Sequence, residues 1–256
     1  MDQYSGLIVA LKFICLEAGK KIMEVYNDPE HFNVEYKDDK SPLTRADKLA
    51  YEVIMEGLRT LPQKFPIISE EEKDIPYQQR KNWSVFWLVD PLDGTKEFIK
   101  RNGQFTVNIA LIENHIPVLG FIYAPVTDEL FYGIKGFGSF KVCEDGECRL
   151  TVNNKKANLV SVGSSSHANE EEAEHLAKFP IVETIKWGSS LKFCKVAEGK
   201  ADVYLRTGPT MEWDTAAGQC ILENAGAKMT KLDGSPFVYN KPSLLNEGFV
   251  CLADIN

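Results

Sequence analysis

SVFWLVDPLDGTKEF, residues 84–98, joins an apolar run directly to a group of polar residues. Residues 85–89 are all aromatic or aliphatic, and the run is too short for a helix, so it predicts a buried strand that ends at Asp90. Pro91 has a fixed φ and no N–H to donate, and we expect it to end the strand and turn the chain. Asp90 and Asp93 would then point into one small volume.

Two carboxylates this close together repel each other unless one is protonated or a cation lies between them. Oxygen ligands at turn spacing suit Mg²⁺, which shares them with substrate phosphate. Gly94 allows the backbone to approach a ligand, the Thr95 hydroxyl can orient a water, and a helical turn over residues 95–101 would offer free N–H groups to an anion. The stretch predicts a metal and phosphate site; the alternative is an ordinary Asp-Gly turn with surface acids.

The composition restricts the class of protein. The chain has 256 residues, of which 44% are hydrophobic and 26% charged, as in a soluble globular protein. With 29 basic and 37 acidic residues, the net charge of -8 argues against a partner that is a nucleic-acid polymer. No apolar stretch is long enough to span a bilayer, and the N-terminus lacks the basic region of a signal peptide. The cytoplasm is the expected compartment, and the composition permits, without predicting, peripheral association with the inner membrane.

The first half begins with helical patterns. Apolar residues recur every three or four positions over residues 7–25, which predicts an amphipathic helix, and residues 27–40 form a polar connection. Thr44 resembles the N-cap of a second helix with Asp47 as its capping-box partner, so Asp47 either serves the cap alone or also lies near the metal site. Residues 66–68 predict a short strand, and Glu70 is the first acid past it.

In the remaining chain, the predicted pattern of strands and helices changes near residue 152. Residues 106–143 contain four short strands separated by turn residues, a pattern typical of antiparallel pairing. From residue 159 strands alternate with helices, which predicts mixed or parallel pairing. We therefore expect an α/β (α+β) protein of two subdomains, 1–152 and 153–256.

Six cysteines without a CxxC pair indicate buried thiols, although Cys143 and Cys148 flank a hairpin turn and could face each other.

Two segments of the second half carry candidate site residues. Asp214 lies directly before an expected helix, between bulky Trp213 and the small residues 216–218; it is either an N-cap or a third inward carboxylate. The segment GSSLK, residues 188–192, places two hydroxyls and Lys192 at a helix start, which suits a second phosphate. Arg206, after a strand, could reinforce that site.

Two motifs together resemble the inositol monophosphatase superfamily: D-P-[IL]-D-G-T at residues 90–95 and W-D-x-x-A-G at residues 213–218. The segments at 188–204 and 206–218 resemble its 3'(2'),5'-bisphosphate nucleotidase branch, and the resemblance covers essentially the whole chain. It implies a layered αβαβα sandwich, Mg²⁺ dependence with two or three ions per site, and lithium sensitivity. The implied partner is a small nucleotide, and the implied assembly is a monomer or homodimer.

The resemblance also implies a role for each matching residue. Glu70, Asp90 and the Leu92 carbonyl would hold one Mg²⁺, and Asp90, Asp93 and Asp214 a second. Thr95, supported by Glu70 or Asp47, would help activate the attacking water, with Glu71 near a third metal position. The substrate would be bound by the amides of Gly94 and Thr95 at the scissile phosphate, and by Ser189, Lys192 and Arg206 at the 5'-phosphate and ribose. Ser166 and His167 would lie near the nucleoside, and Leu92, Asp93 and Asp214 would also face the substrate.

The implied reaction is hydrolysis of 3'-phosphoadenosine 5'-phosphate (PAP) to AMP and phosphate by metal-activated water. Within the superfamily, inositol-1-monophosphatase or sugar bisphosphatase activity is the alternative. A haloacid-dehalogenase-type phosphatase uses the first aspartate of D-x-D-G-T as nucleophile, but here two residues separate the aspartates instead of one. A non-catalytic nucleotide sensor is a further alternative, against which the full set of carboxylates and Thr95 argues.

Overall fold

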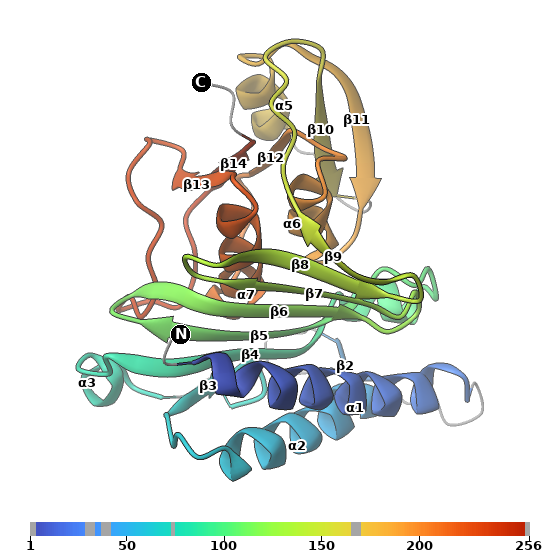
Figure 1. Ribbon diagram of the computed structural model, residues 1–256, viewed down its shortest axis with the longest axis vertical. Coiled ribbons are helices and arrows are strands. Elements are labelled where there is room, and N and C mark those ends of the chain that lie inside the picture. Colours follow the sequence, from blue (N-terminus) through green and yellow to red (C-terminus); the bar gives the residue numbers. More distant parts are fainter. Residues whose placement is uncertain (1–3, 29–33, 37–41, 73–74, 165–169, 254–256) are drawn as a thin grey trace.

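The computed structural model describes residues 4–28, 34–36, 42–72, 75–164 and 170–253. Two β-sheets alternate with helices in layers (Figure 1). Helices α1 and α2 cover one face of a seven-stranded sheet, and α6 and α7 lie between its other face and a five-stranded sheet. Helix α5 lies at the far end of the molecule from α1 and α2. The expected layered αβαβα sandwich is confirmed.

The helices of the described chain include one short 3-10 turn, η1. They are η1 (Ser5–Leu7), α1 (Ile8–Tyr26), α2 (Arg45–Thr60), α3 (Tyr77–Arg80), α4 (Thr95–Ile99), α5 (Glu170–Leu176), α6 (Leu191–Ala197) and α7 (Glu212–Asn224).

The strands form the two layered sheets and one separate hairpin. They are β1 (Val34–Tyr36), β2 (Pro42–Thr44), β3 (Ile67–Ser69), β4 (Val85–Asp93), β5 (Thr106–Glu113), β6 (Ile116–Ala124), β7 (Glu129–Ile134), β8 (Gly138–Cys143), β9 (Gly146–Leu150), β10 (Leu159–Ser164), β11 (Ile181–Trp187), β12 (Val203–Arg206), β13 (Lys228–Lys231) and β14 (Phe249–Leu252).

The seven-stranded sheet explains why residues 85–89 are continuously apolar. Its order is β3-β4-β5-β6-β7-β8-β9, with β3 and β4 parallel and the other pairs antiparallel. Trp87 and Val89 belong to the core beneath α1 and α2, whereas Phe86 and Leu88 belong to the core beneath α6 and α7. Because helices cover both faces of β4, neither set of alternating side chains faces water.

Strand β4 corrects one expectation, because it does not end at Pro91. It continues to Asp93 through an irregularity: Asp90 pairs with Asn108 and Asp93 with Thr106, so β4 has one residue more than β5 over this interval. Such a bulge leaves residues unpaired and bends the strand. Pro91 lies within it, so its missing N–H removes no ladder hydrogen bond. The bulge, rather than a turn after the strand, brings the two aspartates to the sheet edge.

Most other local elements form where the sequence predicts them. The helix over residues 7–25, the Thr44 cap and the antiparallel strands of residues 106–143 are confirmed. The polar connection at 27–40 was expected without regular structure, yet residues 34–36 pair with β2. The turn at residues 145–146 joins β8 to β9, but Cys148 lies opposite Lys141, and all six cysteines are free thiols.

The five-stranded sheet has the order β11-β10-β12-β14-β13, with parallel pairing of β10 to β11 and β12 and antiparallel pairing elsewhere. This confirms mixed pairing in the second half. The division at residue 152 stays a prediction, because α7 packs against the seven-stranded sheet while belonging to the second half.

Among the described helices, none combines the length and apolar character needed to cross a membrane.

Small residues let α7 approach the seven-stranded sheet closely. A Cβ placed on Gly120 of β6 would lie 2.5 Å from the Ala217 carbonyl oxygen and 3.0 Å from its Cα. On the opposite side of α7, a Cβ on Gly218 would lie 2.3 Å from the Phe193 ring of α6. The small residues 216–218 therefore allow α7 to fit between β6 and α6, as the sequence suggested.

We predict that Gly120→Ala destabilises the fold by about 1–3 kcal/mol, because the added methyl group meets helix backbone, which cannot rotate away. Gly6→Ala is the matched control, since a Cβ there meets no atom within 4 Å. Urea denaturation of both variants measures the difference. Equal stability of the two would contradict the proposed close packing of α7.

Candidate active site

Four carboxylates converge where the β4 bulge meets α7. Asp90 and Asp93 come from the bulge, and Asp214 comes from the first turn of α7. Glu70 directly follows β3, and its amide donates to the Val89 carbonyl at 3.1 Å, which places it beside Asp90. The side chain of Asp90 is almost fully buried, at 1% exposure.

Burial and mutual repulsion dominate the electrostatics of this group. Desolvation raises the pKa of Asp90 well above its usual value, and the charges of Glu70, Asp93 and Asp214 raise it further. The pKa of Asp214 is also raised, first by burial and then by the charge of Asp93. Carboxylates in such surroundings bind a proton or a cation more strongly than exposed ones do. The chemistry of this donor set therefore fits hard divalent cations.

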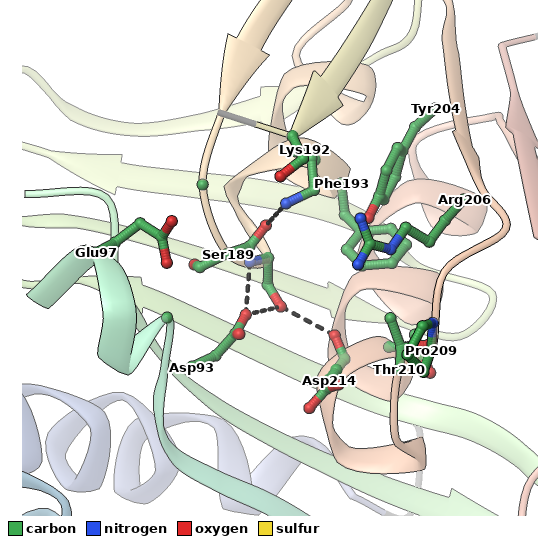
Figure 2. A pocket seen from close by; sticks show the side chains of 15 residues that line it. Asp93, Glu97, Ser189, Lys192, Phe193, Tyr204, Arg206, Pro209, Thr210 and Asp214 are labelled. Atoms are coloured by element: carbon green, nitrogen blue, oxygen red, sulfur yellow. Dashed lines mark hydrogen bonds between the residues drawn. The ribbon is translucent and has the colours of Figure 1, made fainter. Parts of the chain in front are cut away.

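Asp93 is held in place by the segment before α6. Its Oδ2 accepts hydrogen bonds from the amide and hydroxyl of Ser190, both at 2.6 Å, and from Asn108 Nδ2 at 3.4 Å. The Ser190 hydroxyl also lies 2.9 Å from the Asp214 carbonyl oxygen (Figure 2). Gly94, at φ 92°, is the next residue, and a Cβ there would lie 3.0 Å from Ser189 Cβ. Ser190 thus links the β4 bulge to α7.

Asp214 occupies a different helical position from the one expected. The helix begins at Glu212 rather than at residue 215, so Asp214 is the third residue of its first turn and is not the N-cap. Its Oδ2 accepts the Met211 amide at 2.7 Å. A carboxylate at this position satisfies one of the free N–H groups of the helix start. The side chain nevertheless reaches the cavity, so capping and the inward orientation occur together (Figure 2).

Asp47 caps α2 and also contacts Thr95. Its Oδ2 accepts from the Thr44 amide at 2.7 Å and from the Thr44 hydroxyl at 2.5 Å, which completes the cap of α2. Its Oδ1 accepts a longer hydrogen bond from the Thr95 hydroxyl, at 3.4 Å. Burial raises the pKa of Asp47 to about 6, and the nearby charges of Glu71 and Glu70 contribute.

A cavity of about 160 Å³ lies between two of the clustered carboxylates and a cationic region. Asp93 and Asp214 line one side, and Lys192 and Arg206 line the other (Figure 2). Ser189 lies between them, in the left-handed conformation at φ 46°, with its hydroxyl 2.9 Å from that of Thr106. One small polar cavity therefore joins acidic and basic groups.

The two cations are held in different ways. Lys192 is buried, and its Nζ donates to the Ser189 carbonyl at 2.7 Å and lies 5.6 Å from the Tyr204 ring centre. Burial lowers the pKa of Lys192 to about 8, although the charge of Asp93 opposes this effect. Arg206 lies 3.8 Å from Glu172 of α5, which also accepts the Thr207 amide. Lys192 is therefore still mainly protonated at neutral pH, and a bound anion would favour its charged form further.

The structure gathers most of the residues that the sequence singled out, and adds others. Ser166 and His167 lie outside the described residues. The Ser190 hydroxyl was expected to serve a second phosphate, whereas it binds Asp93. Asn108, Glu97 and Glu172 were not expected at the site, although Asn108 was detectable as a polar residue inside an apolar strand. Within the described part of the chain, no three His, Cys, Asp or Glu side chains form a ready-made ligand set for one ion.

Comparison with known proteins gives a consistent result. The sequence profile of the inositol monophosphatase family matches residues 4–250. The chain belongs to this family. Its members are metal-dependent phosphatases, and the two motifs that first suggested the resemblance both lie within the matched region.

Inositol monophosphatase family proteins named 3'(2'),5'-bisphosphate nucleotidase CysQ are similar to the chain over most of its length. The one from Salmonella typhimurium is 47% identical, covering 91% of this chain and 94% of the relative. The one from Haemophilus influenzae is 35% identical, covering 97% and 93%. The crystal structure of CysQ from Bacteroides thetaiotaomicron superposes with a TM-score of 0.88 at 41% identity, covering 98% of each chain.

We predict that Ser190→Ala destabilises the protein by about 1–3 kcal/mol. Without the Ser190 hydroxyl, Asp93 Oδ2 and Asn108 Nδ2 each lose a hydrogen bond in a poorly hydrated site. Ser243→Ala is the control: Ser243 is exposed and its hydroxyl accepts only a local amide. Chemical denaturation compares the two. A loss no larger than that of the control would show that Ser190 does not hold the bulge.

Proposed function

We propose that this protein is a Mg²⁺-dependent phosphatase that hydrolyses the 3'-phosphate of PAP to AMP and phosphate. The observation that carries the proposal is the single cavity that has carboxylates on one side and Lys192 and Arg206 on the other. A substrate with two phosphates fits this division: the carboxylates hold the metal that binds the scissile phosphate, and the cations bind the other phosphate. The nucleotidase names of the similar proteins support the same substrate.

The donor set suits magnesium. Glu70, Asp90 and the Leu92 carbonyl would hold one ion, and Asp90, Asp93 and Asp214 would hold a second. Glu71, whose charge acts on Asp47, would lie near a third. When bound, the ions neutralise phosphate charge and lower the pKa of a coordinated water. Because Asp90 is buried against three other acids, cations relieve the repulsion that otherwise requires a proton.

Thr95 and Asp47 supply the proton-handling groups beside the metal residues. The Thr95 hydroxyl lies 3.4 Å from both Asp47 Oδ1 and the Leu92 carbonyl oxygen, and donation to either leaves its oxygen lone pairs available to accept a proton from an attacking water. Asp47, with its pKa raised to about 6, can hold a proton near neutral pH. The Thr44 cap fixes the other Asp47 oxygen, which keeps the carboxylate oriented toward Thr95.

The cationic side of the cavity would bind the 5'-phosphate. Lys192 and Arg206 offer charge, Ser189 offers a hydroxyl, and Glu172 holds Arg206 at the cavity wall. The amides of Gly94 and Thr95 would contact the scissile phosphate. The assembly would be a monomer or a homodimer.

The structure gives no support to a phosphoaspartate route through Asp90. This side chain is 1% exposed, and its Oδ1 accepts the Leu92 amide at 3.0 Å. A nucleophilic carboxylate must reach the phosphorus, and a side chain this buried, which does not line the cavity, is poorly placed to do so. Attack by water is therefore preferred.

Asp93→Asn should lower kcat for PAP by about a hundredfold or more, because metal-borne charge stabilisation contributes several kcal/mol. The neutral amide keeps the shape of the side chain, so the circular dichroism spectrum should match wild type. Phosphate release with Mg²⁺ measures the rate. Near-normal turnover of the variant would refute the proposed metal site.

Lys192→Met should raise KM for PAP about tenfold, because a charge-assisted hydrogen bond is lost, and should change KM for inositol 1-phosphate much less. In the wild type, KM for PAP should also rise as pH increases through about 8, where Lys192 loses its proton. The variant should lack this rise. Equal effects on the two substrates would remove the reason for preferring a bisphosphate.

A further inference from the structure

A buried polar network outside the cavity holds the first turn of α7. It joins three segments that are distant in sequence: α3, the start of α7 and residues 239–246. Its principal members do not line the cavity that contains Asp214. They are Arg80, Glu212, Asn240, Lys241 and Asn246.

Glu212 is the fully buried charge of this network, at 0% exposure. Its Oε1 accepts from Lys241 Nζ at 2.7 Å and from the Lys241 amide at 3.0 Å, and its Oε2 accepts from the Asn240 amide at 2.7 Å. The Glu212 amide donates to the Leu244 carbonyl at 3.0 Å. A buried carboxylate needs such partners, and here they fix both the backbone and the side chain of the second residue before Asp214.

Asn246 connects this ion pair to the residue that contacts Asp214. Its Oδ1 accepts from Lys241 Nζ at 3.0 Å, and its Nδ2 donates to the Met211 carbonyl at 2.7 Å. The same Nδ2 lies 3.1 Å from the Thr215 hydroxyl. Because the Met211 amide donates to Asp214 Oδ2, the network leads through Met211 to the carboxylate itself.

Arg80 anchors the outer side of the network to the first half of the chain. Its guanidinium donates to Asn240 Oδ1 at 2.8 Å and to the carbonyls of Lys241 and Pro242 at 2.7 and 3.0 Å. Asn240 Nδ2 returns a hydrogen bond to the Arg80 carbonyl at 2.8 Å, with Asn240 in the left-handed conformation at φ 62°. The loop that carries Lys241 therefore has little freedom to move relative to α7.

We propose that Glu212, Lys241 and Asn246 are positioning residues that fix the Asp214 carboxylate for metal binding. This inference rests on the proposed function, because it assigns Asp214 to the Mg²⁺ site. Residues that orient a metal ligand without touching the metal strongly affect its affinity. Stabilisation of the fold alone would not require the network to reach both sides of Asp214, at the Met211 carbonyl and at the Thr215 hydroxyl.

The test is calorimetric titration of substrate-free protein with Mg²⁺, at a temperature where every variant is folded. Glu212→Gln keeps the side-chain shape and removes the charge, and it should weaken Mg²⁺ binding about tenfold. Glu247→Gln is the matched control, because Glu247 forms an exposed ion pair with Lys231 at 2.9 Å. The control should bind Mg²⁺ as wild type does. Unchanged Mg²⁺ affinity in Glu212→Gln, even with a lower Tm, would overturn the inference.

Asn246→Ala provides a second test should Glu212→Gln fail to fold, because it removes no buried charge. It should also weaken Mg²⁺ binding, and wild-type affinity in this variant would equally overturn the inference. The proposed phosphatase function is tested separately, by Mg²⁺ binding and phosphate release in the wild-type protein. If wild-type protein neither binds Mg²⁺ nor releases phosphate from PAP, the proposed function fails; if it does both and the variants bind Mg²⁺ normally, only the positioning role fails.

Discussion

Repulsion among clustered carboxylates around the buried Asp90 is the constraint on which the rest of the site depends. Asp90 is almost fully buried and is acted on by Glu70, Asp93 and Asp214, so burial and like charge both oppose its ionised form. The fold keeps these groups together by fixing each from a different element. Val89 positions Glu70, Ser190 holds Asp93, and Met211 holds Asp214.

The layered architecture explains how the fold tolerates this energetically unfavourable cluster of carboxylates. Strand β4 is covered on both faces, so its apolar residues stabilise the sheet while its bulge delivers the acids at the edge. Helix α7 lies close to β6 because glycine and alanine meet at their contact, which brings Asp214 near the bulge. Close packing and the acidic site are thus two results of the same contact between α7 and the sheet.

Charge is distributed unevenly across the cavity, and this distribution supports the choice of substrate. Ser189 and Ser190 are adjacent in sequence but serve different sides: Ser190 binds Asp93, whereas the Ser189 carbonyl accepts from Lys192. The segment before α6 therefore separates the acidic residues from the cations. A molecule with two phosphates can contact both sides at once. A family member that hydrolyses a single phosphate would need only the acidic side.

The sequence by itself determined the elements with strong local signals. Apolar periodicity predicted α1, the Thr44 and Asp47 pattern predicted the start of α2, and the two motifs predicted the family and its carboxylates. These signals are local because helix period, capping and turn chemistry involve residues a few positions apart.

Only the tertiary structure decided how β4 passes through Pro91, where α7 begins, and which groups hold the acids. Ser190 contacts Asp93 across 97 positions, and Arg80 contacts Asn240 across 160. No local pattern specifies such partners, because they depend on how the sheets and helices pack. The acidic residues of the site can be identified from the sequence. Their surroundings, and therefore their protonation and orientation, are determined by tertiary packing.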